Sequence, residues 1–160
     1  MALRPCHLSA PGSPTRLRAE CGSLTVPEDR ANPGGRRIGL HVAVLPALSR
    51  TPEPDPLFFI TGGPGEAATQ DYVRVSPAFT RLNSKRDIVL VDQRGTGQSA
   101  PLRCSDPVEE ADAGDGADLG KWIGSCLEEL EADTRFYHTL PAVDDLDQVR
   151  AALGYGRINL

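Results

Sequence analysis

LFFITGGPG at residues 57–65 and IVLVDQRGTGQS at residues 88–99 carry the strongest structural signal in this chain. Each begins with four consecutive apolar residues and runs directly into a glycine-rich turn. An unbroken apolar run is typical of a strand that is buried on both faces, as in a parallel sheet. Residues 57–60 and 88–91 are therefore predicted to be buried strands of one parallel sheet.

The residues that precede these two strands predict an antiparallel opening to the sheet. Residues 17–26 read as a strand that ends at Pro27, and residues 36–45 alternate apolar and polar side chains as a half-buried strand does. The turn-rich residues 30–35 lie between them and favour a hairpin.

The remaining segments predict helices and one more strand. Residues 67–82 can hold a crossover helix that Ser76-Pro77 interrupts, and residues 121–130 form a short amphipathic helix. A further helix is expected from an N-cap at Thr139 to a stop at Gly154. Pro141 falls in its first turn, and Asp144 and Asp145 lie near its positive end.

Residues 157–160 are predicted to open another strand, so strands and helices alternate along the chain. This order predicts an α/β fold with an opening hairpin followed by parallel strands and crossover helices. A sheet protein rarely ends at the start of a strand. We therefore expect an incomplete sheet, with residues 1–160 forming the N-terminal portion of one larger domain.

Composition limits the classes of function that the chain can have. It has 160 residues, with 17 basic and 22 acidic side chains, and the net charge of −5 argues against general nucleic-acid binding. No apolar run approaches the length of a membrane-spanning helix, so no membrane partner is expected. Ten acids and one base lie within residues 105–133, and the first half of this segment is expected to be a solvated loop.

Four cysteines allow either two disulfides or four reduced thiols. Local pairing favours Cys6–Cys21 and Cys104–Cys126, each of which closes a short loop, although three pairings are possible. Disulfides would indicate an oxidising compartment, so a secreted or periplasmic location is favoured, with a cytoplasmic one as the alternative. No secretory signal is visible at the start of the sequence. No cluster of metal ligands exists, and neither a metal nor a cofactor is expected.

The two glycine-rich turns allow several readings when each is taken alone. The first turn can bring bare N–H groups against a ligand and stabilise an oxyanion, or it can be an ordinary Gly-Pro turn. GTGQSA at residues 95–100 matches a dinucleotide fingerprint, but Pro101 prevents the helix that this motif requires. A phosphate-binding P-loop around Gly120-Lys121 fails on its glycine spacing, and Trp122 stands where Ser or Thr is needed.

Taken together, the turns resemble a pattern of the α/β-hydrolase fold, in its proline iminopeptidase and tripeptidyl aminopeptidase-like branch. That branch carries G-G-P-G after one strand and D-Q-R-G-x-G-x-S after the next, and residues 62–65 and 92–99 match both in order. Thr61 stands where proline iminopeptidases usually carry His, which favours the tripeptidyl-like branch. Four further stretches agree with the secreted members of that branch: CGSLTVPED at 21–29, RDIV at 86–89, SAPLRC at 99–104 and residues 145–155.

The resemblance implies roles for the residues of both turns. The first turn is expected to be an oxyanion loop in which the backbone N–H of Gly63 donates to the oxyanion, while Pro64 and Gly65 shape the loop. Asp92 and Arg94 are expected to pair, or to bond to the backbone, and so to hold the second turn against the first. The full expected sets are Gly62, Gly63, Pro64 and Gly65 for the loop, and Asp92, Arg94, Gly95, Gly97 and Ser99 for its support.

The resemblance also implies that the catalytic residues are absent from these 160 residues. In this fold the nucleophilic serine follows the strand equivalent to residues 157–160 in a G-x-S-x-G turn, and the acid and base come later. Residues 97–101 form half of such a turn, but Pro101 replaces the second glycine. His7, His41 and His138 come too early in the chain for the expected order.

Two hypotheses follow from these observations. The first is that the chain is the N-terminal part of a serine hydrolase that releases amino-terminal residues or tripeptides from a peptide substrate. This part is expected to be inactive alone, and its partner would be the missing C-terminal part of its own domain. The alternative is a complete, non-catalytic binding module whose open sheet edge needs a partner.

Overall fold

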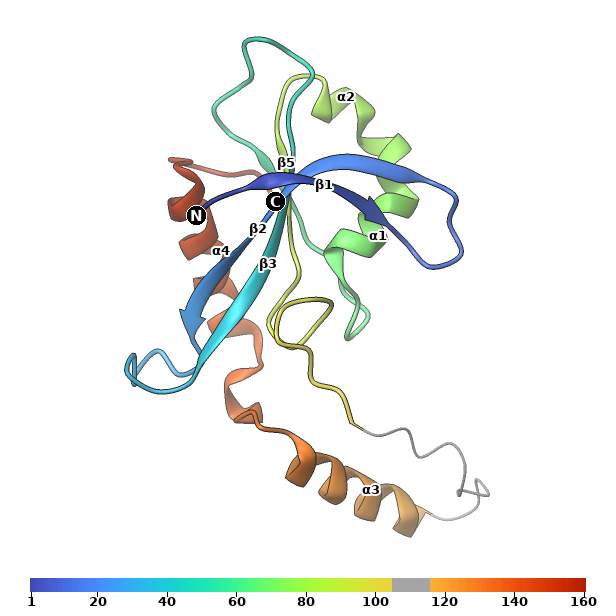
Figure 1. The fold of residues 1–160 in the computed structure, drawn as a ribbon, viewed down its shortest axis with the longest axis vertical. Coiled ribbons are helices and arrows are strands. Elements are labelled where there is room, and N and C mark those ends of the chain that lie inside the picture. The colour runs from blue at the N-terminus through green and yellow to red at the C-terminus, as the bar shows by residue number, and fades with distance from the viewer. Residues whose placement is uncertain (105–115) are drawn as a thin grey trace.

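The computed structural model describes residues 1–104 and 116–160, with only the backbone described for residues 116–119. The described residues form a five-stranded mixed sheet in the order β1-β2-β3-β5-β4 with helices on both faces (Figure 1). The elements are β1 (Arg4–Ser9), β2 (Arg16–Pro27), β3 (Arg37–Leu45), β4 (Leu57–Phe59), α1 (Ala68–Val75), η1 (Ser76–Phe79), α2 (Thr80–Asn83), β5 (Ile88–Val91), α3 (Gly116–Glu129), η2 (Thr134–Phe136) and α4 (Thr139–Leu153).

The two apolar runs form the parallel part of the sheet, as predicted. β4 pairs with β5 in parallel from Leu57 opposite Ile88 to Phe59 opposite Leu90. All four residues of β5 are buried, because the strand lies inside the sheet with a helix layer on each side. The crossover between the strands is interrupted at Ser76-Pro77, as predicted, because α1 ends at Val75 and the 3-10 helix η1 begins at Ser76.

The antiparallel part of the sheet is larger than the sequence predicts. β2 and β3 form the expected hairpin, but β1 adds a further antiparallel strand that the prediction missed. The disulfide Cys6–Cys21 joins β1 to β2, and Cys104–Cys126 joins the segment after β5 to α3. The preferred pairing of the cysteines is therefore confirmed.

Three other predictions need correction. His138, with extended backbone, is the N-cap of α4, and Thr139 is already helical. In the predicted strand at residues 157–160, only Asn159 forms a β-bridge, parallel to Leu57. Helix α3 begins at Gly116, five residues before the predicted helix. The acidic loop predicted from residue 105 lies outside the described residues up to residue 115.

Two apolar clusters fill the space between the layers. On one face of the sheet, Tyr72 and Val73 of α1 pack on Ile88 and Leu90. On the other face, Val149 of α4 packs with side chains from β2, β3, β4 and β5. The helices thus fix the ends of β4 and β5 from both sides, while α3 extends away from the sheet (Figure 1).

Candidate active site

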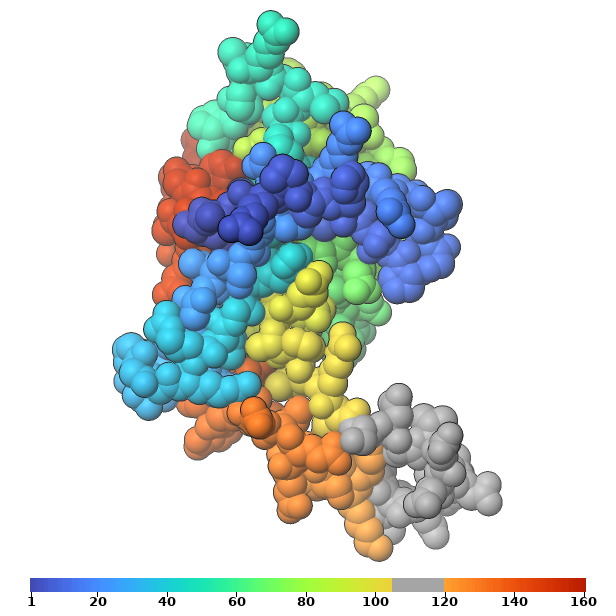
Figure 2. Space-filling model, in the orientation of Figure 1, coloured from blue at the N-terminus to red at the C-terminus, as the bar shows by residue number. Residues whose placement is uncertain are grey.

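The two glycine-rich turns meet at one edge of the sheet. Residues 60–67 leave the end of β4, and residues 92–99 leave the end of β5. Because the two strands are parallel neighbours, both turns emerge at the same edge, where ligands commonly bind in α/β proteins. The segment after β5 is exposed between β3 and α1 (Figure 2, yellow).

The predicted oxyanion loop is the exposed connection from β4 to α1. Residues 62–65 are all exposed, and the Gly63-Pro64 peptide bond is cis. Gly63 and Gly65 have φ angles of 146° and 89°, which favour glycine. Within the described part of the chain, the N–H groups of Gly62 and Gly63 donate to no acceptor. These donors are therefore available to a ligand.

Asp92 holds the far end of this loop from inside the protein. Its carboxylate is fully buried and accepts from the backbone N–H of Thr69 at 3.0 Å and from the Thr69 hydroxyl at 2.9 Å. The other carboxylate oxygen accepts from the backbone N–H of Gln98 at 3.1 Å. The start of α1 and the second turn are thus fixed to one side chain.

Gly97 and Ser99 allow the second turn to lie close to its neighbours. Gly97 has a φ of 51°, and a Cβ there would lie 2.8 Å from the Cβ of Ala67 and against the Asp92 carboxylate. The buried Ser99 hydroxyl accepts from the backbone N–H of His41 at 2.8 Å, which ties the turn to β3. Gly95 has a φ of 84° and lies beside Tyr137.

Arg94 connects this turn to the first half of α4. Its guanidinium donates to both carboxylate oxygens of Asp145, at 2.7 Å and 2.8 Å, and to the backbone carbonyls of Glu28 and Phe136. Arg94 and Asp92 therefore do not pair with each other, and each bonds to the backbone. The sequence prediction did not assign Asp145, Glu28 or Phe136 to the site.

A second group of charges extends the network to the β2–β3 hairpin. Arg30 also contacts Asp145, and Glu28 pairs with Arg36 at 2.6 Å. Glu28 accepts from the hydroxyl of Tyr137 at 2.8 Å. Burial and this hydrogen bond raise the pKa of Tyr137 to about 12.

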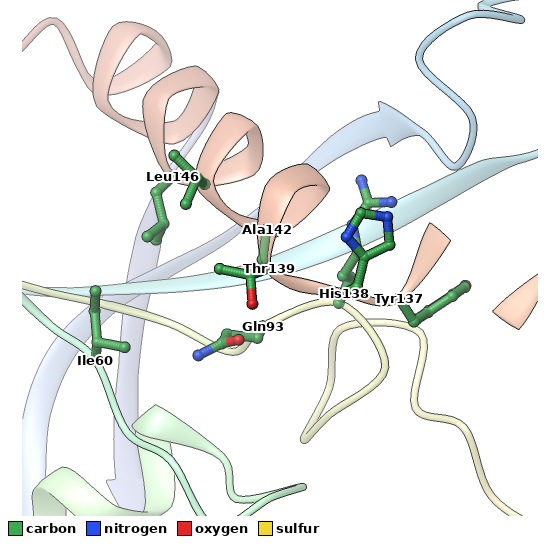
Figure 3. Close-up of a pocket in the computed structure, with 9 residues that line it drawn as sticks. Ile60, Gln93, Tyr137, His138, Thr139, Ala142 and Leu146 are labelled. Atoms are coloured by element: carbon green, nitrogen blue, oxygen red, sulfur yellow. The ribbon is translucent and has the colours of Figure 1, made fainter. Parts of the chain in front are cut away.

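An open cavity of about 380 Å³ lies between the ends of β4 and β5 and the first turns of α4 (Figure 3). Its walls combine apolar side chains with the polar groups of the second turn. The hydroxyl of Thr139 points toward Gln93 in this view. The lining residues are Ile60, Gln93, Arg94, Tyr137, His138, Thr139, Ala142, Val143 and Leu146.

The described residues supply no assembled nucleophile. No serine hydroxyl bonds to a histidine ring in the described part of the chain, and the cysteines there form disulfides. The His41 ring lies 3.5 Å from the side-chain amide of Gln98, whereas His138 lines the cavity.

Among residues 1–104 and 116–160, no group of His, Cys, Asp and Glu is arranged to hold a metal ion. No helix in those residues is long and apolar enough to cross a membrane.

The comparisons with known proteins relate this α/β chain to hydrolases. The chain is 32% identical over 158 residues to the tripeptidyl aminopeptidase of Streptomyces lividans, a match that covers 88% of this chain. It is 35% identical over 94 residues to carboxylesterase B of Mycobacterium tuberculosis, which covers 57% of this chain. No model of a protein family matches the chain. These relatives support a hydrolase family.

The relatives are much longer than this chain. The match covers 29% of the Streptomyces lividans protein and 18% of the Mycobacterium tuberculosis protein. The activity of a whole hydrolase therefore remains a proposal for the present chain.

Proposed function

We propose that this chain supplies the oxyanion loop of a serine hydrolase that releases amino-terminal residues or tripeptides from peptides. The observation that carries the proposal is the pair of unbonded N–H groups at Gly62 and Gly63, on a loop anchored from the buried Asp92. Fixed donors of this kind stabilise the negative charge of a tetrahedral intermediate. The similarity to a tripeptidyl aminopeptidase supports the choice of a peptide substrate.

The proposed chemistry divides between this chain and a further part of the hydrolase. The oxyanion loop stabilises charge, but acyl transfer also needs a nucleophile and a base. We propose that these groups come from a C-terminal part of the same domain, which would also cover the cavity beside α4. The exposure of Ile60 and Val143, 46% and 56%, supports a polypeptide partner at this face. The 160 residues alone are expected to hydrolyse nothing.

A chimera tests this proposal. The present chain would replace the matching part of the Streptomyces lividans tripeptidyl aminopeptidase, and release of a chromophore from a tripeptidyl reporter would be measured. We expect the folded chimera to hydrolyse the reporter, with no hydrolysis by the 160-residue chain alone. Hydrolysis by the pure chain in proportion to its concentration, or a folded chimera without activity, would contradict the proposal.

The alternative function is a non-catalytic binding module on the same scaffold. The exposed apolar side chains around the cavity fit this function equally well, since they would suit a separate protein partner as well as a further part of the same domain. Sedimentation and thermal unfolding of the pure chain separate the two. A monodisperse monomer favours the module, whereas folded protein that self-associates through its exposed apolar face favours the incomplete hydrolase.

A further inference from the structure

Thr61 lies at the base of the candidate oxyanion loop and is held by two side chains. Its backbone carbonyl accepts from the side-chain amide of Gln93, with 3.2 Å between the nitrogen and the oxygen. Its hydroxyl donates to the carboxylate of Asp71 on α1. Both bonds come from elements that are themselves fixed, since Gln93 follows the buried strand β5 and Asp71 lies within a helix.

The orientation of Thr61 determines how the loop begins. In the trans peptide bond between Thr61 and Gly62, the carbonyl and the N–H point in opposite directions. Fixing the Thr61 carbonyl therefore fixes the direction of the Gly62 N–H. Gly62 has no side chain, and a Cβ there would meet nothing within 4 Å, so its own surroundings supply no restraint.

Gln93 and its neighbour Asp92 hold the two ends of the same segment. Asp92 binds the backbone of Thr69 at the start of α1, and Gln93 binds the backbone of Thr61 at the end of β4. The glycine loop lies between these two anchors. Consecutive residues of one turn thus fix both ends of the exposed connection.

We propose that Gln93 is a positioning residue that orients the Gly62 N–H donor of the oxyanion loop through the Thr61 carbonyl. The role requires a hydrogen-bond donor, which a carboxamide supplies and an ionised carboxylate does not. This inference rests on the proposed function for its catalytic meaning, whereas the orientation of the loop can be measured without any activity.

The test is to compare Gln93→Glu with Gln93→Met by following the backbone amide resonances of Gly62 and Gly63 in the 160-residue chain. At neutral pH both substitutions remove the donor, and we expect both to displace these resonances. The introduced carboxyl group regains a donor when it is protonated, so only Gln93→Glu should recover the original positions as the pH falls through about 4. Gln148→Glu, the same change at an exposed site of α4, is the control and should leave both resonances in place.

Each outcome decides the inference. The inference is supported if the Gly62 and Gly63 resonances return to their original positions at low pH in Gln93→Glu but not in Gln93→Met. Resonances from β3 and β5 show that each variant is folded. Unchanged glycine resonances at neutral pH, or equal behaviour of the two variants at low pH, would overturn it.

In an active chimera, Gln93→Met should lower kcat with little change in KM. An inactive chimera would count against the proposed function while the amide measurement still judged the role of Gln93.

Discussion

Arg94 and Asp145 form a two-bond ion pair between positions 51 residues apart, with side-chain exposures of 1% and 3%. The pair joins the turn after β5 to the first half of α4. The remaining guanidinium donors reach the carbonyls of Glu28 and Phe136, so the buried charge is hydrogen-bonded on several sides. These bonds join four segments: the turn after β5, α4, the residue after β2 and η2.

We predict that Arg94→Met is strongly destabilising. The substitution leaves the buried Asp145 carboxylate with Arg30 as its remaining cationic partner. Removing one partner of a buried ion pair lowers the free energy of unfolding by about 3–5 kcal/mol. Urea unfolding measures the change in the free energy of unfolding. The matched control is Arg135→Met, which breaks an exposed pair with Asp133 and should change stability little. If the two substitutions lower the free energy of unfolding equally, the buried Arg94 network stabilises the protein no more than an exposed ion pair does.

Gly97→Ala should disturb the contact between the second turn and the loop. An added Cβ would press on Ala67 and on the Asp92 carboxylate, and the φ of 51° is unfavourable for alanine. Gly12→Ala is the control, because Gly12 has a φ of 74° but open space around it, and it should cost only about 1–2 kcal/mol. Thermal unfolding should show the larger loss for Gly97→Ala. A loss no greater than that of Gly12→Ala would mean that close packing at Gly97 is unimportant.

The tyrosines predict a loss of stability at alkaline pH. Burial raises the pKa of Tyr72 to about 12, and burial with the Glu28 hydrogen bond raises that of Tyr137 to about 12. Burial and the hydrogen bond to Asp87 also raise the pKa of Tyr155. An unfolded tyrosine loses its proton near pH 10. The free energy of unfolding therefore keeps its full value below about pH 10 and falls as the pH rises towards 12.

Urea unfolding at a series of pH values checks this prediction. Tyr72→Phe should reduce the alkaline loss of stability, because phenylalanine has no proton to lose and burial alone accounts for the shift at Tyr72. A free energy of unfolding that stays constant from about pH 9 to about pH 11 would contradict the prediction.

The two disulfides should contribute differently to stability. Replacing Cys6 and Cys21 by Ser removes a link inside the sheet and should lower the free energy of unfolding by about 3 kcal/mol. Replacing Cys104 and Cys126 by Ser should mainly release α3, which extends away from the sheet, and so speed its proteolysis. Unfolding curves and limited proteolysis of the two variants measure both effects. Equal global destabilisation by the two pairs would contradict this division.

The parallel strands were predictable because their signal is local. Four apolar residues followed by glycines identify β4 and β5 without any knowledge of their partners. β1 was missed because its sequence RPCHLS has a single buried residue, Leu8, and its pairing with β2 depends on register. The N-cap of α4 is His138, which has extended backbone and makes no side-chain capping bond, so the capping preference that pointed to Thr139 did not identify it.

The loops of the candidate site, and Asp92 and Arg94 as residues that hold them, were predictable, but the partners of these two residues were not. The positions of the glycines point to the turns, yet the partners of Arg94 lie in segments far along the chain. One signal was available for Asp145, which shares a buried helix face with Val149 four residues later. A charged residue on such a face needs a buried partner, and Arg94, which was expected to pair with Asp92 or to bond to the backbone, was a candidate for that partner. Gln93 carried no comparable signal, since its bond to Thr61 depends on the approach of two turns.

The most direct test of the central claim is a crystal structure of the chimera with a phosphonate bound to its nucleophilic serine. The phosphonate oxygen mimics the oxyanion, and donors to an oxyanion lie about 2.7–3.1 Å from it. We predict that the backbone nitrogen of Gly63 lies at this distance from that oxygen. An oxygen bound by other donors, with the loop of Gly62, Gly63, Pro64 and Gly65 turned away, would contradict the claim.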